Sequence, residues 1–453
     1  MVDAKVQDLA GLSRDVARAA AALARWQTTL ADAPELAADD DPFAGVRHVS
    51  GKSTRDELGA LAPSAAELAL RDGLRRWVTA FVGVRIGLPD EVAIAREALV
   101  ERGHFEGEPP RLARFADVWR AIPQAQTAAE VDLWLRAAAE AAPPVAAAIR
   151  KRSERRAEVA RRLDLPHSWG LWVDTPPGAM QAAAWGVLDA TEDLARTVRR
   201  ETVGRDVSAA AILHAAVARD AGEGWPARPT THWFEDAFGE GPKELPIRMP
   251  ALPRPLGASS FARALEMFGF ATRLAMAPTA MPFALSHDPA SVSAHRFGLV
   301  FGALAANVEF QVRVLRLGRR SALAQARTLA RVALLEARTE AARVLLGDDA
   351  AFAPADLFDE IGARLFEKPL PRRLRGAWPA PRRDAPARFI ALLQALGMTN
   401  ALRDRFDVDW FRNPRAWSHL RESTSGPAFE PIDETSLEPA ARALGRTFSE
   451  AFG

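Results

Sequence analysis

The stretch Glu266-Met267-Phe268-Gly269-Phe270-Ala271 lies in an apolar segment a little past the middle of this 453-residue chain. Apolar side chains recur in the segment at steps of three and four residues, the period of one helix face: Phe261, Leu265, Phe268. Ser259 or Ser260 is expected to cap the helix. Residues four apart share a helix face, so Glu266 and Phe270 point the same way. Taken alone, the segment predicts an ordinary buried helix.

The same stretch resembles His-Glu-x-Gly-His-Ala, the zinc-binding helix of many metallopeptidases. Glu266, Met267 and Phe270 stand where the first histidine, the general-base glutamate and the second histidine would be. Two imidazoles four residues apart can hold one zinc ion, whereas a glutamate and a phenylalanine at that spacing cannot. The resemblance implies a peptidase-shaped protein that lacks the metal of the peptidase.

A second element follows after a loop that contains Met281-Pro282 and His287-Asp288-Pro289. His295-Arg296-Phe297-Gly298-Leu299 opens an apolar helix and resembles a His-Glu-x-Gly-Asp element, which in helical zinc peptidases supplies a third ligand from its glutamate. Arg296 would occupy the place of that glutamate, and a cation there repels a divalent ion. All three inferred ligand positions therefore carry other residues.

Together these motifs are similar to the helical gluzincins, the class of oligoendopeptidase F, thimet-type oligopeptidases and angiotensin-converting enzyme. The similarity extends over residues 130–425 in layout and is sharpest at 255–302 and 407–416. Asp407-Val408-Asp409-Trp410-Phe411-Arg412-Asn413-Pro414 resembles an acidic-aromatic-Arg-Asn-Pro segment of some members. The resemblance implies an all-α fold with two lobes around a cleft. These enzymes stabilise the oxyanion with a tyrosine, and this chain has no tyrosine, which indicates lost catalysis independently of the motif alignment.

Composition excludes several other classes of function. The formal net charge is +1, so no global field favours nucleic acid or a membrane surface. Cysteine is absent, which rules out disulfides, thiolate metal sites and a cysteine nucleophile. The first residues form no signal-peptide core, and the most apolar stretch, 297–312, is too short and too polar to span a bilayer. We expect a cytoplasmic protein without a cofactor, and its oligomeric state stays open.

Alanine, leucine, arginine and glutamate at helical spacing predict helices along most of the chain. The expected helices cover 5–31, 54–61, 64–86, 90–103, 111–121, 127–141, 143–163, 179–203, 207–220, 259–276 and 291–347, the last containing a motif helix at 293–312. Residues 221–257 are predicted to be a loop region with room for a short strand at 244–250. We expect an N-terminal helical region (1–125), a gluzincin-like domain (126–425) and a C-terminal tail with a short helix (426–453).

Other candidate sites have weaker support. His287 and His295, with Glu266 or Asp288, match no recognised metal-ligand spacing, so helix capping or local hydrogen bonding is the simpler role. His295 beside Arg296 fits a pocket for a carboxylate. Gly51-Lys52-Ser53 lacks the preceding strand and the glycine spacing of a phosphate loop.

The residues support three hypotheses about function. The favoured one is a catalytically inactive, metallopeptidase-like protein that binds a peptide, a small ligand or a partner protein in a former active-site cleft. Its expected cleft residues are Glu266, Met267, Phe270, His287, His295 and Arg296, with no metal ligand and no catalytic residue. The second is an enzyme with a rebuilt site that uses Glu266, His287 or His295 as acid or base. The third is a helical structural or assembly subunit without a ligand site.

Overall fold

The structure is a computed structural model that describes residues 8–65, 67–106, 111–205, 207–250, 252–347, 353–380, 382, 384–429 and 432–452. The described part is helical almost throughout, with twenty α-helices and one small two-stranded sheet. The predicted all-α fold class is therefore confirmed. Among the described residues, no helix has both the length and the apolar character that crossing a bilayer requires.

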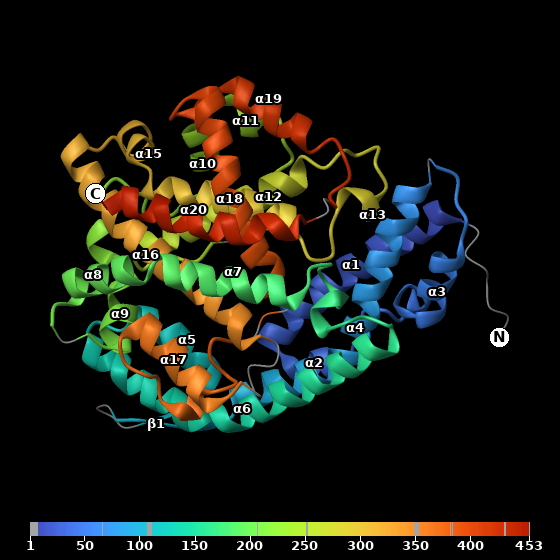
Figure 1. The fold of residues 1–453 in the computed structure, drawn as a ribbon, viewed down its shortest axis with the longest axis horizontal. Coiled ribbons are helices and arrows are strands. Elements are labelled where there is room, and N and C mark those ends of the chain that lie inside the picture. Colours follow the sequence, from blue (N-terminus) through green and yellow to red (C-terminus); the bar gives the residue numbers. More distant parts are fainter. Residues whose placement is uncertain are drawn as a thin grey trace.

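The helices of the first half are α1 (Leu9–Asp32), α2 (Pro34–Ala38), α3 (Lys52–Ala60), α4 (Leu68–Leu99), α5 (Phe115–Ala121), α6 (Ala128–Arg162), α7 (Pro177–Ala190), α8 (Glu192–Val203) and α9 (Ala209–Ala215). Those of the second half are α10 (Thr231–Phe238), α11 (Glu240–Lys243), α12 (Ala258–Ala275), α13 (Phe283–Ser286), α14 (Val292–Gly302), α15 (Val308–Arg313), α16 (Arg319–Leu346), α17 (Ala355–Phe366), α18 (Ala385–Phe406), α19 (Pro414–Ser423) and α20 (Glu434–Phe452). In Figure 1, α1 to α4 gather at one end of the molecule, and α6 runs along its lower edge. Helices α10, α11 and α19 lie together at the top of the same view.

Two long helices continue through prolines at which the sequence predicted a break. Helix α4 contains Pro89, and α6 contains Pro143 and Pro144. The prediction of separate helices is therefore wrong at both places. Helix α4 joins 64–86 to most of 90–103, and α6 joins 127–141 to 143–163. An interior proline removes one helical hydrogen bond and costs about 3 kcal/mol. Burial on both sides of the prolines in α6, as at Ala142 and Val145, offsets that cost.

A β-hairpin replaces the end of the helix predicted at 90–103. Strand β1 (Glu101–Phe105) pairs antiparallel with β2 (Arg111–Arg114). A Cβ added at Gly103 would lie 2.3 Å from the carbonyl oxygen of Ala137, so only glycine lets this strand lie against α6. Phe105 packs its ring 4.3 Å from that of Trp134, centroid to centroid. Contact with α6, rather than local helix propensity, decides the conformation here.

Further boundaries differ from those predicted. The helix expected at 179–203 divides at Thr191 into α7 and α8, and the segment 291–347 divides into α14, α15 and α16. The region 221–257 contains α10 and α11, and its described residues form no strand at 244–250. The N-cap residue of α12 is Gly257, which has no side chain to cap the helix, so neither predicted serine takes that position. The Ser259 hydroxyl donates to the Val217 carbonyl oxygen at 2.9 Å, and the Ser260 hydroxyl accepts from the Leu256 N–H at 3.3 Å.

The buried apolar side chains form two large clusters. One joins α1, α4, α6 and α7 with the C-terminal half of α16. The other surrounds Phe268 on α12, whose ring stacks on Phe234 and Phe238 of α10 at centroid distances of 4.7 and 4.9 Å. Trp410 and Phe411, from the segment singled out at 407–414, are fully buried in this second cluster. That segment therefore packs the core beneath α12 and α14.

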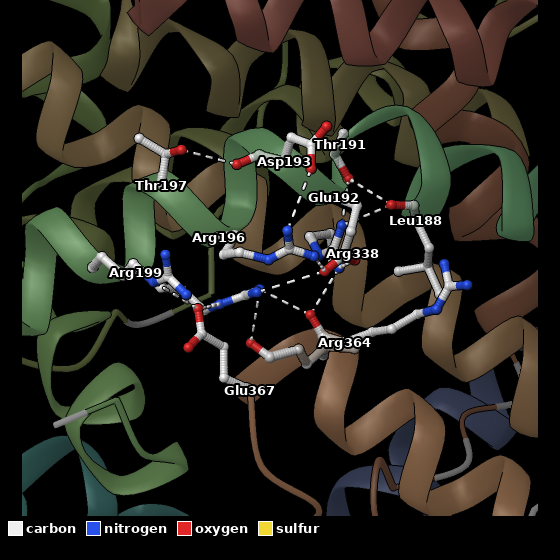
Figure 2. A network of polar contacts seen from close by, with 12 residues as sticks. Leu188, Thr191, Glu192, Asp193, Arg196, Thr197, Arg199, Arg338, Arg364 and Glu367 are labelled. Atoms are coloured by element: carbon white, nitrogen blue, oxygen red, sulfur yellow. Dashed lines mark hydrogen bonds and ion pairs between the residues drawn. The ribbon is translucent and has the colours of Figure 1, made fainter. Parts of the chain in front are cut away.

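A buried polar network ties α7 and α8 to α16 and α17 (Figure 2). Arg338 of α16, 1% exposed, donates to the Leu188 carbonyl at 2.9 Å, the Thr191 hydroxyl at 2.7 Å, Glu192 at 2.6 Å and the Arg364 carbonyl at 2.8 Å. Arg199 donates to the same Arg364 carbonyl at 2.8 Å. One guanidinium thus binds carbonyls in the last turns of two helices, α7 and α17, which fixes the relative position of these helices.

Candidate functional site

The two motif segments lie side by side in the structure, on α12 and α14. Two glycines allow the close approach. A Cβ at Gly269 would lie 2.6 Å from the Phe297 carbonyl oxygen, and one at Gly298 would lie 2.9 Å from the Glu266 carbonyl oxygen. Any larger residue at either position would push the helices apart. The glycines of both motifs therefore serve helix packing.

Glu266 is held by two arginines from opposite directions. Its carboxylate accepts from both Nη atoms of Arg388 on α18, with Nη2 at 3.1 Å from Oε2. Arg263 Nη1, one turn earlier on α12, donates to Oε2 at 2.6 Å. Burial alone would raise the pKa of Glu266, but the hydrogen bonds from Arg388 and the charge of Arg263 outweigh it and lower the pKa. The carboxylate is therefore ionised and already occupied by two cations.

A second layer of charge lies behind this pair. Arg388 also donates from Nε to Glu340 of α16 at 3.2 Å. Burial lowers the pKa of Arg388, and its hydrogen bonds to Glu266 more than reverse this, so the pKa stands above its usual value. Arg388 side-chain exposure is 4%. An arginine this deep stays in place because carboxylates flank it on both sides.

Glu336, on α16, interacts electrostatically with Glu266, Arg388, Arg263 and Glu340. The residue keeps some contact with solvent, while protein groups crowd around its carboxyl group. Loss of hydration, together with the negative charge of Glu266, raises the pKa of Glu336 to about 7. This carboxyl group is thus divided between its neutral and charged forms near neutral pH.

Phe270 and His295 face each other across α12 and α14. Their ring centroids are 5.1 Å apart in an edge-to-face arrangement. His295 Nε2 lies 3.4 Å from Oδ2 of Asp384, and Arg382 binds the same carboxylate through two nitrogens at 2.9 and 2.6 Å. Burial would raise the pKa of Asp384, but His295 and Arg382 together hold it well below its usual range. His295 is thereby fixed in orientation by an anion.

Arg296 does not face Glu266 and Phe270, which corrects the role inferred from sequence. Adjacent helix residues point about 100° apart, and on α14 it is His295 that faces Phe270. Arg296 lines a separate cavity of about 180 Å³, together with Arg76, Asp174 and Asp288. The position opposite the motif helix therefore carries a histidine, and Arg296 belongs to another site.

The remaining predicted residues line one large cavity of about 800 Å³, which we call the main cavity. Five of the six predicted cleft residues border it: Glu266, Met267, Phe270, His287, His295. Burial, followed by the charge of Arg273, lowers the pKa of His287, so this histidine is neutral at pH 7. It also stacks on Phe283 with a centroid distance of 4.4 Å.

A second cavity of about 370 Å³ shares Phe270 and His295 with the main cavity. Its other lining residues combine polar side chains, Gln27, Ser291, Arg382 and Asp384, with Trp172, Pro289 and Ala290. The Phe270–His295 pair thus stands where the two cavities border each other. A ligand that extends from one cavity into the other would pass this pair.

Several side chains that shape the site were missed from sequence: Arg248, Arg263, Glu336, Glu340, Arg382, Asp384 and Arg388. Arg388 and Asp384 lie more than a hundred residues from Glu266 along the chain and in no motif. Arg263, one turn before Glu266, was the single partner that helical spacing could have shown.

The residues present do not fit a zinc ion at the motif position. Glu266 offers oxygens that two guanidinium groups already occupy, and Phe270 has no donor atom. His295 is the remaining nitrogen ligand, and its neighbours Arg382 and Asp384 form a closed ion pair. In the described part of the chain, no three histidine, cysteine, aspartate or glutamate side chains converge in a way that would hold a metal.

The fold of this chain was compared with those of known proteins. No protein-family model matches the chain, and no curated protein matches it by sequence. Among solved structures, a protein described as an oligoendopeptidase F from Bacillus anthracis str. Ames is similar, with a TM-score of 0.54, 10% identity, and coverage of 90% of this chain and 84% of that one. PZ peptidase A, solved with an inhibitor, is similar with a TM-score of 0.55, 9% identity, and coverage of 87% and 84%. The chain therefore has the fold of the helical oligoendopeptidases.

Proposed function

We propose that this protein binds a peptide or a small ligand in the main cavity and does not cleave it, in a fold that it shares with oligoendopeptidases. The observation that carries the proposal is the Glu266 carboxylate, saturated by Arg388 and Arg263 at the place where the motif resemblance expects a zinc ligand. Breaking that arrangement to bind a metal would strand two arginines, one of them buried.

The cavity supports binding in the absence of the expected catalytic parts. Its volume of about 800 Å³ is in the range of ligand pockets, and its walls combine an apolar face with a few charged groups. The general-base position of the motif carries Met267, which has no proton to transfer. The chain also has no tyrosine to stabilise an oxyanion.

An assay for cleavage tests the proposal directly. The purified full chain is incubated with a defined mixture of synthetic peptides of 5 to about 15 residues, with and without added ZnCl₂, and products are followed by mass spectrometry. We expect no zinc-dependent cleavage and retention of a subset of peptides on size-exclusion chromatography. Zinc-dependent cleavage that disappears in Glu266→Ala would refute the proposal.

A rebuilt enzyme in the same cavity is a second candidate, because Glu266 and His295 border one cavity. Glu266 is a poor base there, since its pKa is lowered and both arginines hold its lone pairs. Turnover of any substrate with a pH profile that His295→Gln abolishes would favour this candidate over simple binding.

A further inference from the structure

The charges that border the main cavity are unequal. Three arginines line it, Arg248, Arg263 and Arg388, against a single carboxylate, Glu266. The two histidines do not change the sign, because His287 is neutral and His295 is paired with Asp384. Glu266 and Glu340 compensate Arg388 and part of Arg263. A positive charge therefore remains at the cavity wall.

Arg248 is the cation that no described residue neutralises. It is exposed, it lies on the irregular connection between α11 and α12, and it has neither an ion pair nor a hydrogen bond with any other described side chain. Arg263 is 49% exposed and uses one Nη atom for Glu266, which leaves further N–H groups directed elsewhere. Guanidinium groups with free N–H donors bind carboxylates through paired hydrogen bonds.

The other walls indicate what carries the anionic group. The main cavity has an apolar face: Met267, Phe270, Leu274, Met281, Phe283. The adjoining second cavity adds polar groups to the wall, among them Ser291 and the Arg382–Asp384 ion pair. A hydrocarbon tail laid over that ion pair would remove its water without replacing the lost hydrogen bonds, whereas a peptide backbone supplies both donors and acceptors.

Building on the proposed function, we infer that the ligand is a short peptide with a free C-terminal carboxylate, which Arg248 binds with help from Arg263. Its terminal apolar side chains lie against α12 in the main cavity, and its preceding backbone passes the Phe270–His295 pair into the second cavity. Arg248 is then the residue that selects a free carboxyl end.

Fluorescence anisotropy tests the inference with an N-terminally labelled hexapeptide of glycine, alanine, leucine and phenylalanine, made as the free acid and as the C-terminal amide. We expect the acid to bind the full chain about tenfold more tightly than the amide, a difference of about 1.4 kcal/mol. Arg248→Gln should weaken acid binding to the level of the amide and leave amide binding unchanged. Arg254→Gln, an exposed arginine on the same connection outside the cavity lining, is the matched control and should change neither.

Each other outcome overturns the inference. If the native protein binds the acid and the amide equally tightly, the C-terminal carboxylate is not recognised. The proposed binding function would still stand. Binding of sodium laurate in isothermal titration, with no binding of either peptide, assigns the cavity to fatty acids. If the Arg248→Gln variant still binds the acid more tightly than the amide, residues other than Arg248 bind the carboxylate. Zinc-dependent cleavage of the hexapeptide would instead refute the proposed function, and the acid-to-amide ratio would then be read from the cleavage-deficient Glu266→Ala protein.

Discussion

The carboxylate of Glu266 on α12 accepts two hydrogen bonds from Arg388 on α18, a residue 122 positions later in the chain. This pair joins the motif helix to the helix that also positions Asp384 next to His295. Side-chain exposure is 12% for Glu266 and 4% for Arg388. The same buried contact therefore closes the motif position to a metal and organises one wall of the main cavity.

Removal of one member of this pair is expected to destabilise the protein far more than replacement of both. Glu266→Leu leaves Arg388 buried with a single carboxylate, and such a loss costs about 3 to 5 kcal/mol. In the double variant Glu266→Leu with Arg388→Met, apolar side chains of similar size fill the space, and Glu340 keeps Arg343 at 3.6 Å. Urea unfolding of the native protein, the two single variants and the double variant measures the coupling free energy between Glu266 and Arg388. Additive losses in the double variant would contradict the buried ion pair.

The folded protein should lose stability as pH rises through the titration of Glu336. Its pKa of about 7 in the native state exceeds the ordinary value of 4.5, so between these pH values the native state binds more protons than the unfolded state. The contribution of the neutral carboxyl group is present below pH 4.5 and is lost by about pH 7.

Glu336→Gln removes this dependence, because the amide does not titrate. The urea concentration at the unfolding midpoint, measured at pH 5, 6, 7 and 8, should decrease with rising pH in the native protein more than it does in the variant. Glu422→Gln, at an exposed position on α19, serves as the control and should track the native protein. Parallel curves for Glu336→Gln and the native protein would show that Glu336 titrates normally.

Arg338→Met should destabilise the protein by about 3 kcal/mol, because the Leu188 carbonyl and the Thr191 hydroxyl lose their guanidinium donor and Glu192 loses its shortest ion pair. Arg199 still donates to the Arg364 carbonyl. Arg196→Met is the matched control in the network of Figure 2, since its side chain is 46% exposed. The control should change stability by no more than about 0.5 kcal/mol. Thermal unfolding followed by circular dichroism compares the two, and equal losses would contradict the clamp assigned to Arg338.

Zinc binding should be gained only when the ligand on α14 is placed at residue 295. A variant with Glu266→His, Phe270→His and His295→Glu, together with Arg388→Gln to remove the buried cation, presents three ligands to one point between α12 and α14. The matched variant carries His295→Leu with Arg296→Glu in place of His295→Glu, so residue 295 offers no ligand and the new carboxylate points into the other cavity. Isothermal titration with ZnCl₂ should detect about one ion per chain in the first variant and none in the second. Equal binding by both would mean that α14 faces α12 differently.

Sequence alone was sufficient where the information was local. The helical spacing of Phe261, Leu265 and Phe268 predicted a helix at 259–276, and α12 starts and ends within one residue of that range. The downstream element was also helical, but its phase was wrong: which of His295 and Arg296 faces α12 depends on how the helix is rotated in the fold. Because adjacent helix residues point about 100° apart, Arg296 lines a different cavity from His295 and does not face α12.

The parts that sequence did not show depend on contacts between distant segments. The hairpin at Gly103 follows from a backbone approach to Ala137, and the continuous helix through Pro143 follows from burial along its length. Arg388 and Asp384 occupy no motif, and they enter the site because α18 packs on α14. Charge partners of this kind have no signal in sequence spacing.

Zinc stoichiometry of the native protein shows whether the position of Glu266 and Phe270 holds a metal ion. The purified chain is dialysed to equilibrium against buffered micromolar ZnCl₂ at pH 7.5, then passed through a desalting column, and protein-bound zinc is measured by inductively coupled plasma mass spectrometry. We predict zinc well below one ion per chain, equal to that of the Phe270→Ala variant. One tightly held zinc ion per chain, lost on Glu266→Ala, would contradict the account.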